Sequence, residues 1–198
     1  MFFRRIALLL SAGTLAVGLS AALAGTANAT LPPPDPNWNE IISVYAGHAG
    51  NVMCVDDPSH STTINTQLQL WHCHGSSNSN GAPQRWFFDP TFLEDGTPAY
   101  TIQVYNTLST GPDDPGHPLC ISYWNDWDDV GERLALHDCW PETIEWAMDP
   151  APGLNNFELR DPYTDLCLAL GNYSDSNGTP LVATTCNYND PLQVFTLG

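Results

Sequence analysis

The sequence of 198 residues has almost no basic side chains. It contains five arginines and no lysine against 22 aspartates and glutamates, which gives a formal net charge of −17. A surface this acidic repels phosphate backbones and anionic lipid headgroups, so we expect neither nucleic acid nor a membrane surface as a partner. A neutral ligand meets no such repulsion, and the charge by itself favours solubility.

Sustained helical periodicity is missing as well. Seventeen prolines and 15 glycines divide the chain into short segments, several of which alternate or are rich in β-forming residues. The sequence has no nucleophile elbow, no His-Glu-x-x-His zinc motif and no phosphate-binding glycine loop. With 22 acidic residues, a catalytic pair of carboxylates stays an open alternative. We nevertheless expect an all-β protein that is not an enzyme, with no catalytic residues and no cofactor.

The one long apolar run lies at the N-terminus. Residues 1–29 combine the basic start MFFRR, an uncharged apolar stretch and the small residues ANA. These features predict a secretory signal peptide, and hence a secreted, extracellular protein. A membrane anchor is the alternative, but Ser, Thr and Gly interrupt the run, and no later segment is long enough to span a bilayer. The remaining 169 residues suffice for one domain, which follows a Pro-rich arm at 30–37.

All six cysteines lie in the part that would be exported, and their spacing is regular. Six cysteines allow 15 pairings in an oxidising compartment. Consecutive cysteines form three intervals of 19 positions, which indicates an internal repeat with one disulfide in each unit. The expected bonds join Cys54 to Cys73, Cys120 to Cys139, and Cys167 to Cys186.

Other residues recur in register with the cysteines. A short β-rich run precedes each pair, namely IISVYA, YTIQVYN and NFELRD. An aromatic residue follows each pair, at Trp86, Trp146 and Phe195. Each repeat is therefore predicted to contain four short strands, about twelve in all.

Three four-stranded repeats fit a closed threefold arrangement better than a solenoid, which would carry polar capping repeats at its ends. We predict a β-trefoil of three pseudo-threefold repeats within one domain, residues 38–198. The middle repeat is the longest, because segments 89–100 and 106–120 precede its first cysteine, and we interpret both as surface loops. The expected repeat bounds are 38–90, 91–150 and 151–198.

The motifs of the chain resemble those of the ricin B-chain type lectins and the family 13 carbohydrate-binding modules. The family pattern is a Cys-Val-Asp or Cys-Leu-Asp start, an apolar alternation ending in Trp-x-Cys, and a QxW repeat element, all occurring three times. The first repeat has CVD at 54–56, LQLWHC at 68–73 and QRW at 84–86. The resemblance implies a lectin that recognises galactose-type or xylan-type sugars on glycans or on plant or microbial polysaccharide.

The resemblance places one sugar site on the first repeat. It implies that Asp56 accepts hydrogen bonds from two adjacent sugar hydroxyls while the Trp71 ring stacks on the apolar face of the pyranose. A charged acceptor and an aromatic plane suit these two surfaces of a sugar. Gln69 lies two residues before Trp71 and so on the same strand face, where it contacts the ligand or fixes Asp56. Gln84 resembles the family glutamine that supports the aspartate.

One departure from the family pattern lies beside Gln84. Sugar-binding members commonly carry an asparagine immediately before this glutamine, whereas this chain has Pro83, which offers no side-chain donor. Either Asn78 or Asn80 replaces that donor from the preceding loop, or the site is weakened.

The other two repeats keep the cysteine frame without the residues of the site. Ser122 and Ala169 stand at the position of Asp56. His137 and Thr184 stand at the position of Trp71. The third repeat has lost its site, while His137 leaves two alternatives for the second, a modified site or a structural histidine.

Two further clusters offer alternative sites. Segment Tyr123–Asp129 combines tryptophans with aspartates, which suits a second carbohydrate surface, a Ca²⁺ site, or rings that cover the base of the trefoil. His72 and His74 flank Cys73 in a possible zinc trio, but the disulfide assignment removes the thiolate, and no metal site is expected.

A different class of function is also open. A β-trefoil protein-interaction module, such as a protease inhibitor, would dock a protruding loop such as 107–118 in a protease cleft. An inhibitor has no need of the combination of Asp56, Gln69 and Trp71, whereas a sugar site does. The sequence therefore favours the carbohydrate-binding protein.

Overall fold

The computed structural model describes most of the chain after residue 30. The described residues are 31, 33–45, 52–75, 79–105, 118–125, 129–139 and 144–198, with the backbone alone for 79–81. The predicted signal peptide lies outside this part. Within the described residues, no helix is long and apolar enough to cross a membrane.

Short β-strands make up nearly all of the regular structure in the described residues. The strands are β1 (Ile41–Ser43), β2 (Met53–Asp56), β3 (Thr66–Gln67), β4 (Gln69–His72), β5 (Trp86–Phe92), β6 (Pro98–Val104), β7 (Leu119–Tyr123), β8 (Leu134–Asp138), β9 (Ala147–Pro150), β10 (Phe157–Asp161), β11 (Leu166–Leu170), β12 (Thr179–Thr185) and β13 (Phe195–Leu197). Three short 3-10 helices accompany them, η2 (Pro58–His60), η3 (Ser79–Gln84) and η5 (Pro191–Gln193). The all-β prediction is confirmed, and β3 is an extra two-residue strand beside the twelve expected.

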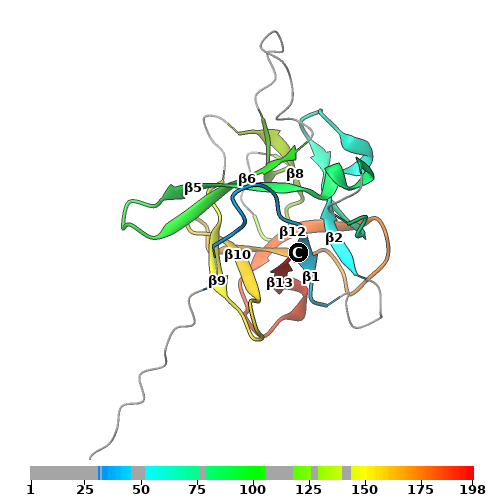
Figure 1. The fold of residues 1–198 in the computed structure, drawn as a ribbon. Coiled ribbons are helices and arrows are strands. Elements are labelled where there is room, and N and C mark those ends of the chain that lie inside the picture. The colour runs from blue at the N-terminus through cyan, green and yellow to red at the C-terminus, as the bar shows by residue number, and fades with distance from the viewer. Residues whose placement is uncertain are drawn as a thin grey trace, which may run out of the picture.

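Seven strands form a closed ring (Figure 1). An eight-stranded antiparallel sheet has the order β11-β12-β4-β2-β1-β13-β10-β9, and β10 pairs a second time with β11. A second sheet has the order β3-β8-β7-β6-β5. Isolated bridges from Arg133 to Val182 and from Tyr100 to Trp146 connect the two sheets. Ring closure leaves no free edge among those seven strands.

The three predicted disulfides are present, and each lies in an equivalent pair of antiparallel strands. The first cysteine of each repeat faces the residue two places before the second cysteine, so the register is the same in all three. The facing pairs are Cys54 with Trp71, Cys120 with His137, and Cys167 with Thr184. The disulfides join Cys54 to Cys73, Cys120 to Cys139, and Cys167 to Cys186.

The aromatic residue after each cysteine pair lies in the core. The indole Nε1–H of Trp86 donates to the Val55 carbonyl at 3.0 Å, and that of Trp146 donates to the equivalent Ile121 carbonyl at 3.1 Å. Phe195 takes this place in the third repeat and is fully buried. These rings therefore fasten the last strand of each repeat to the core.

The three repeats meet at the side chain of Gln67. Its Nε2 amide lies 3.1, 2.9 and 3.0 Å from the carbonyl oxygens of Leu68, Leu134 and Leu181. These leucines occupy the same position in the three repeats, five residues before the second cysteine. Leu68 also donates its backbone N–H to Leu134 and accepts from Leu181. One polar side chain thus links all three units at their meeting point.

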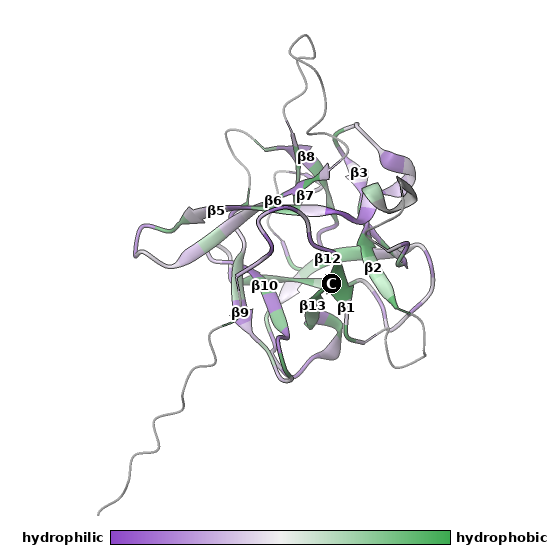
Figure 2. Cartoon of the chain, in the orientation of Figure 1, coloured by the Kyte–Doolittle hydropathy of each residue, from purple (hydrophilic) through white to green (hydrophobic). Residues whose placement is uncertain are grey.

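The hydrophobic core fills the ring and the space between the sheets. Its largest fully buried side chains include Trp86, Trp146, Phe157 and Phe195. Figure 2 shows hydrophobic residues gathered on β1, β2 and β13 at the centre of the molecule. The opposite faces of these strands are free to carry polar side chains because side chains alternate along a strand.

Segment 89–100 is a strand hairpin, so its interpretation as a surface loop was wrong. β5 and β6 pair over seven residue positions, from Trp86 with Val104 to Phe92 with Pro98. Pro90 lies in β5, the edge strand of its sheet, and Pro98 is the first residue of β6, so each proline stands where a sheet tolerates one. The predicted repeat boundary at residue 90 falls within β5.

Candidate functional site

β2 and β4 bring three of the predicted site residues onto one face. Asp56 faces Gln69 directly across the strand pair, and Cys54 faces Trp71. Residues that alternate along a strand, and those that face each other across a pair, lie on the same side of the sheet. The intervening Val55 and Leu70 point into the core and are fully buried. Asp56, Gln69 and Trp71 therefore share the outer face.

Two glutamine amides hold the Asp56 carboxylate from opposite sides. Gln69 Nε2 donates to Asp56 Oδ2 at 2.9 Å, and Gln84 Nε2 donates to Oδ1 at 3.0 Å. Asp56 is 4% exposed, and Gln84 is fully buried. Each carboxylate oxygen has further acceptor capacity after accepting one amide hydrogen. We call Asp56, Gln69, Trp71 and Gln84 the first-repeat site.

Burial changes the acidity of this carboxylate. Desolvation raises the pKa of Asp56 above its ordinary value, while the Gln69 and Gln84 hydrogen bonds and the charges of His74 and His60 act in the opposite direction. The charged form is therefore harder to maintain here than in water. The two amides offset part of that cost and fix the orientation of the carboxylate.

Gln84 has a second role that recurs elsewhere in the chain. Its Nε2 also donates to the His72 carbonyl at 2.9 Å, and its Oε1 accepts from the His74 N–H at 2.7 Å. Gln193 makes the same two backbone bonds in the third repeat, to the Thr185 carbonyl and from the Asn187 N–H. The bonds to the backbone around the disulfide are thus structural, and the bond to Asp56 is particular to the first repeat.

Variants of Gln84 and Gln193 distinguish an effect on stability from an effect on sugar binding. Gln84→Leu and Gln193→Leu each remove two bonds to the backbone, so each is expected to lower the free energy of unfolding by about 1–3 kcal/mol. Only Gln84→Leu also frees the Asp56 carboxylate, and we expect it alone to weaken sugar binding. Urea denaturation together with binding to an immobilised sugar measures both effects. Equal binding losses in the two variants would show that the Asp56 contact has no special role.

Trp71 lies next to a turn from the third repeat. The ring is half-buried, and β4 pairs with the start of β12 through Leu70 with Thr179. The N–H of His72 donates to Asn177 Oδ1 at 2.9 Å, and the Gly178 N–H donates to the Leu70 carbonyl at 2.9 Å. Sequence reasoning missed this contribution, because no local motif indicates which turn lies beside β4.

Pro83 has a structural role in the described chain. It is buried at the end of η3, and its carbonyl accepts the Asp57 N–H at 2.9 Å. This bond ties η3 to the residue after Asp56. The proposed replacement donors lie outside the described structure, Asn78 entirely and Asn80 in its side chain.

The second and third repeats lack both the aspartate and the glutamine that faces it. Ala135 faces Ser122, and Val182 faces Ala169, at the positions where Gln69 faces Asp56. His137 stands across from Cys120, as Trp71 stands across from Cys54. Among the equivalent positions of the described strand pairs, a carboxylate between two amides thus occurs in the first repeat alone.

The structure describes part of the two clusters that offered alternative sites, Tyr123–Asp129 and the trio around Cys73. Tyr123 is 8% exposed, and its hydroxyl donates to Asp161 Oδ2 at 2.9 Å, so its ring is not part of an exposed platform. Trp124 is half-buried, with the Arg133 guanidinium 5.9 Å from its ring centroid, and residues 126–128 lie outside the described structure. Cys73 is disulfide-bonded and so supplies no thiolate between His72 and His74.

Solved structures share this fold at low sequence identity. The Macrolepiota procera ricin B-like lectin in complex with lactose is 17% identical with a TM-score of 0.56, over 84% of this chain and 97% of that one. The Rhizoctonia solani agglutinin is 15% identical with a TM-score of 0.60, over 84% and 97%. A designed threefold-symmetric protein, ThreeFoil, is 16% identical with a TM-score of 0.61, over 81% and 96%.

The sequence matches no protein-family model and no curated protein sequence. The structural likenesses nevertheless extend over almost the whole length of each of these three proteins. They confirm the resemblance that the cysteine and QxW motifs indicated. The chain has the fold of the ricin B-type β-trefoil lectins.

Proposed function

We propose that this chain is a secreted carbohydrate-binding protein whose main site is the first-repeat site. One observation carries the proposal, namely the buried Asp56 carboxylate held between the Gln69 and Gln84 amides beside Trp71. The bonds from Gln69 and Gln84 leave each Asp56 oxygen able to accept a further hydrogen bond, on the same strand face as the Trp71 ring.

The geometry suits a pyranose. The two oxygens of Asp56 accept hydrogen bonds from two adjacent hydroxyls, and charged acceptors strengthen such bonds. The half-exposed Trp71 ring covers the apolar C–H face of the sugar. Because the amides hold the carboxylate in place before the sugar arrives, little conformational entropy is lost on binding.

The ligand class follows from this chemistry and from the neighbouring structures. A ricin B-like lectin of the same fold was solved with lactose, and we propose galactose-type or xylan-type sugars on glycans or on plant or microbial polysaccharide. The net charge of −17 disfavours nucleic acid and anionic membranes. A single site predicts weak binding, about −4 kcal/mol and so millimolar.

The finer features of the architecture belong to the same proposal. We infer a secretory signal peptide at 1–29, an arm at 30–37, and a domain at 38–198 whose three repeats are related by a pseudo-threefold axis. The recurring cysteine register and the meeting of three leucine carbonyls at Gln67 support that axis. Two of the structurally similar proteins are named as a lectin and an agglutinin, which supports the proposal that this chain is not an enzyme.

A glycan array and a polysaccharide pulldown with the oxidised protein test the proposal. We expect binding to sugars that present two adjacent free hydroxyls, and the array names the ligand. Failure of every glycan to bind would contradict the proposal. The protease inhibitor alternative depends on loop 107–118, of which only Pro118 is described, and no structural observation favours it.

The pH dependence of binding gives an independent check. The pKa of Asp56 is raised above its ordinary 3.8, so the carboxylate gains a proton, and binding is lost, as the pH falls through that raised value. Asp56 affects stability in the opposite sense, because the cost of burying its charge disappears on protonation. Measuring binding and circular dichroism from neutral pH to about pH 3 separates the two effects. Unchanged binding over that range would contradict the role of Asp56.

A further inference from the structure

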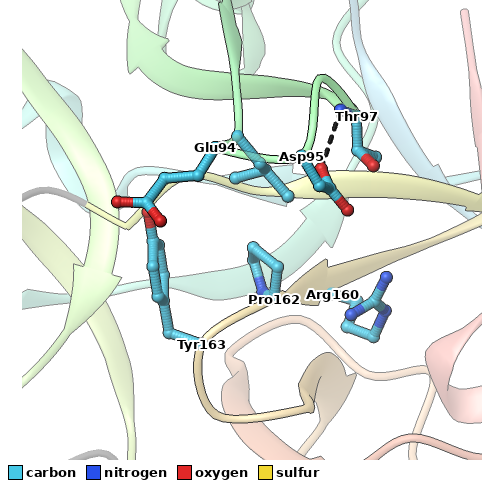
Figure 3. Close-up of a pocket in the computed structure, with 7 residues that line it drawn as sticks. Glu94, Asp95, Thr97, Arg160, Pro162 and Tyr163 are labelled. Atoms are coloured by element: carbon cyan, nitrogen blue, oxygen red, sulfur yellow. Dashed lines mark hydrogen bonds between the residues drawn. The ribbon is translucent and has the colours of Figure 1, made fainter.

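A second pocket lies where the β5–β6 hairpin approaches the turn after β10. It has a volume of about 280 Å³. Figure 3 shows Glu94 and Tyr163 on one side, Arg160 on the other and Pro162 between them. The lining residues used below are Glu94, Asp95, Thr97, Arg160, Pro162 and Tyr163. We call this the hairpin pocket.

The hairpin wall of the pocket has a fixed shape. The Leu93 N–H donates to the Thr97 carbonyl at 2.9 Å, and the Gly96 N–H donates to the Leu93 carbonyl at 2.9 Å. The Thr97 N–H donates to Asp95 Oδ1 at 2.9 Å. Gly96 has a φ of +85°, which suits glycine in this tight turn. The turn therefore presents Glu94 and Asp95 from a rigid backbone.

The opposite wall is held by the buried Asp161. Its Oδ1 accepts the Tyr163 N–H at 2.9 Å, and its Oδ2 accepts the hydroxyls of Tyr123 and Thr164, each at 2.9 Å. Asp161 is 3% exposed. These bonds fix the turn that carries Pro162 and Tyr163, so the pocket exists before any ligand arrives.

The lining combines hydrogen-bond acceptors, donors and an aromatic plane. Tyr163 is 73% exposed although its hydroxyl donates to Glu145 at 3.3 Å. Arg160 uses Nε toward Asp149 and Nη1 toward Asp165, which leaves three of its five N–H groups for other acceptors. Glu94 makes no hydrogen bond within the described residues. An exposed ring beside unused carboxylate and guanidinium groups is the chemistry that a polyhydroxylated ring requires.

We propose that the hairpin pocket is a second carbohydrate site, which binds a neutral pyranose. The Tyr163 ring covers the apolar face of the sugar, Glu94 and Asp95 accept from its hydroxyls, and Arg160 donates to a sugar oxygen. An anionic ligand is repelled by the carboxylates, whereas the hydroxyls of a neutral pyranose can use both the acceptors and the donors of the pocket. The site lies outside the strand pair that carries Asp56, so it shares only the ligand class with the proposed function.

Four proteins test the proposal by affinity chromatography on immobilised lactose and immobilised xylotriose. They are the wild type, Asp56→Ala with Trp71→Ala, Glu94→Gln with Tyr163→Ala, and the quadruple variant. We expect the Asp56 and Trp71 variant to keep part of its retention on at least one column, and the quadruple variant to elute as on a column without sugar. Tyr188→Ala is the control, because that tyrosine is also exposed, at 62%, but lies outside the pocket.

The outcomes separate the two sites. The hairpin pocket is not a sugar site if the Asp56 and Trp71 variant loses all retention. The same conclusion follows if the quadruple variant is retained to the same extent as the Asp56 and Trp71 variant. If the Glu94 and Tyr163 variant alone loses all retention, the hairpin pocket stands and the first-repeat site fails. If the wild-type protein is retained on neither column, both proposals are overturned for these sugars.

Discussion

Replacing Asp56 by alanine is expected to abolish sugar binding at the first-repeat site while the protein stays folded. Hydrogen bonds to a charged group contribute about 1.5–3 kcal/mol, and each 1.4 kcal/mol corresponds to a tenfold change in the dissociation constant. The variant should therefore bind roughly 10 to 100 times more weakly, which is undetectable from a millimolar start. Folding should persist, because Gln84 keeps its bonds to the backbone around His72 and His74.

The repeats supply matched controls for this experiment. Ser122 occupies the position of Asp56 in the second repeat, and Thr184 occupies that of Trp71 in the third. Ser122→Ala and Thr184→Ala should therefore leave binding unchanged, whereas Asp56→Ala and Trp71→Ala should each remove binding at the first-repeat site. Isothermal titration with the sugar found on the array measures all four, with circular dichroism to confirm folding. Wild-type binding by Asp56→Ala would refute the assignment of the first-repeat site.

Removing a disulfide is expected to have the largest effect on stability. Each bond closes a loop of 19 residues, and in the chain-entropy model such a closure contributes about 3 kcal/mol. Cys54→Ala with Cys73→Ala, and Cys167→Ala with Cys186→Ala, should therefore lower the free energy of unfolding by similar amounts. Guanidinium denaturation under oxidising conditions measures this.

The two disulfide variants should differ in function. The Cys54–Cys73 bond lies in the strand pair that carries the first-repeat site, whereas the Cys167–Cys186 bond lies in a pair without the site residues. We expect the variant without the Cys54–Cys73 bond to lose sugar affinity, and the variant without the Cys167–Cys186 bond to keep it, under conditions where both stay folded. Equal affinity of the two variants would show that the bond does not position Asp56 and Trp71.

The periodic features of the chain were predictable because they repeat. Three equal cysteine intervals predicted three disulfides, and the aromatic residues in register with them predicted four strands in each repeat. The alternation on β2 and β4 also placed Asp56, Gln69 and Trp71 on one face. Each of these inferences depends on residues close together in the sequence or on a pattern that occurs three times.

Features that join distant segments were not predictable in the same way. The bonds from Gln67 to three leucine carbonyls depend on closure of the whole ring. Asn177 contacts the edge of β4 from 105 residues away. Segment Tyr123–Asp129 was left open between a carbohydrate surface, a Ca²⁺ site and a structural role, because the bond from Tyr123 to Asp161 joins different repeats. The β5–β6 hairpin was mistaken for a loop because proline fits a strand only at special positions, here an edge strand for Pro90 and a strand start for Pro98.

The tryptophan indole signals in a two-dimensional NMR titration test the central claim most directly. The chain has seven tryptophans, and Trp71→Phe identifies the signal of the ring expected to stack on the sugar. On addition of the sugar found by the array, we predict that the Trp71 indole signal and the side-chain amide signals of Gln69 and Gln84 shift together, with one dissociation constant. If these signals stay in place while those of other residues shift, the sugar binds elsewhere and the first-repeat site is wrong.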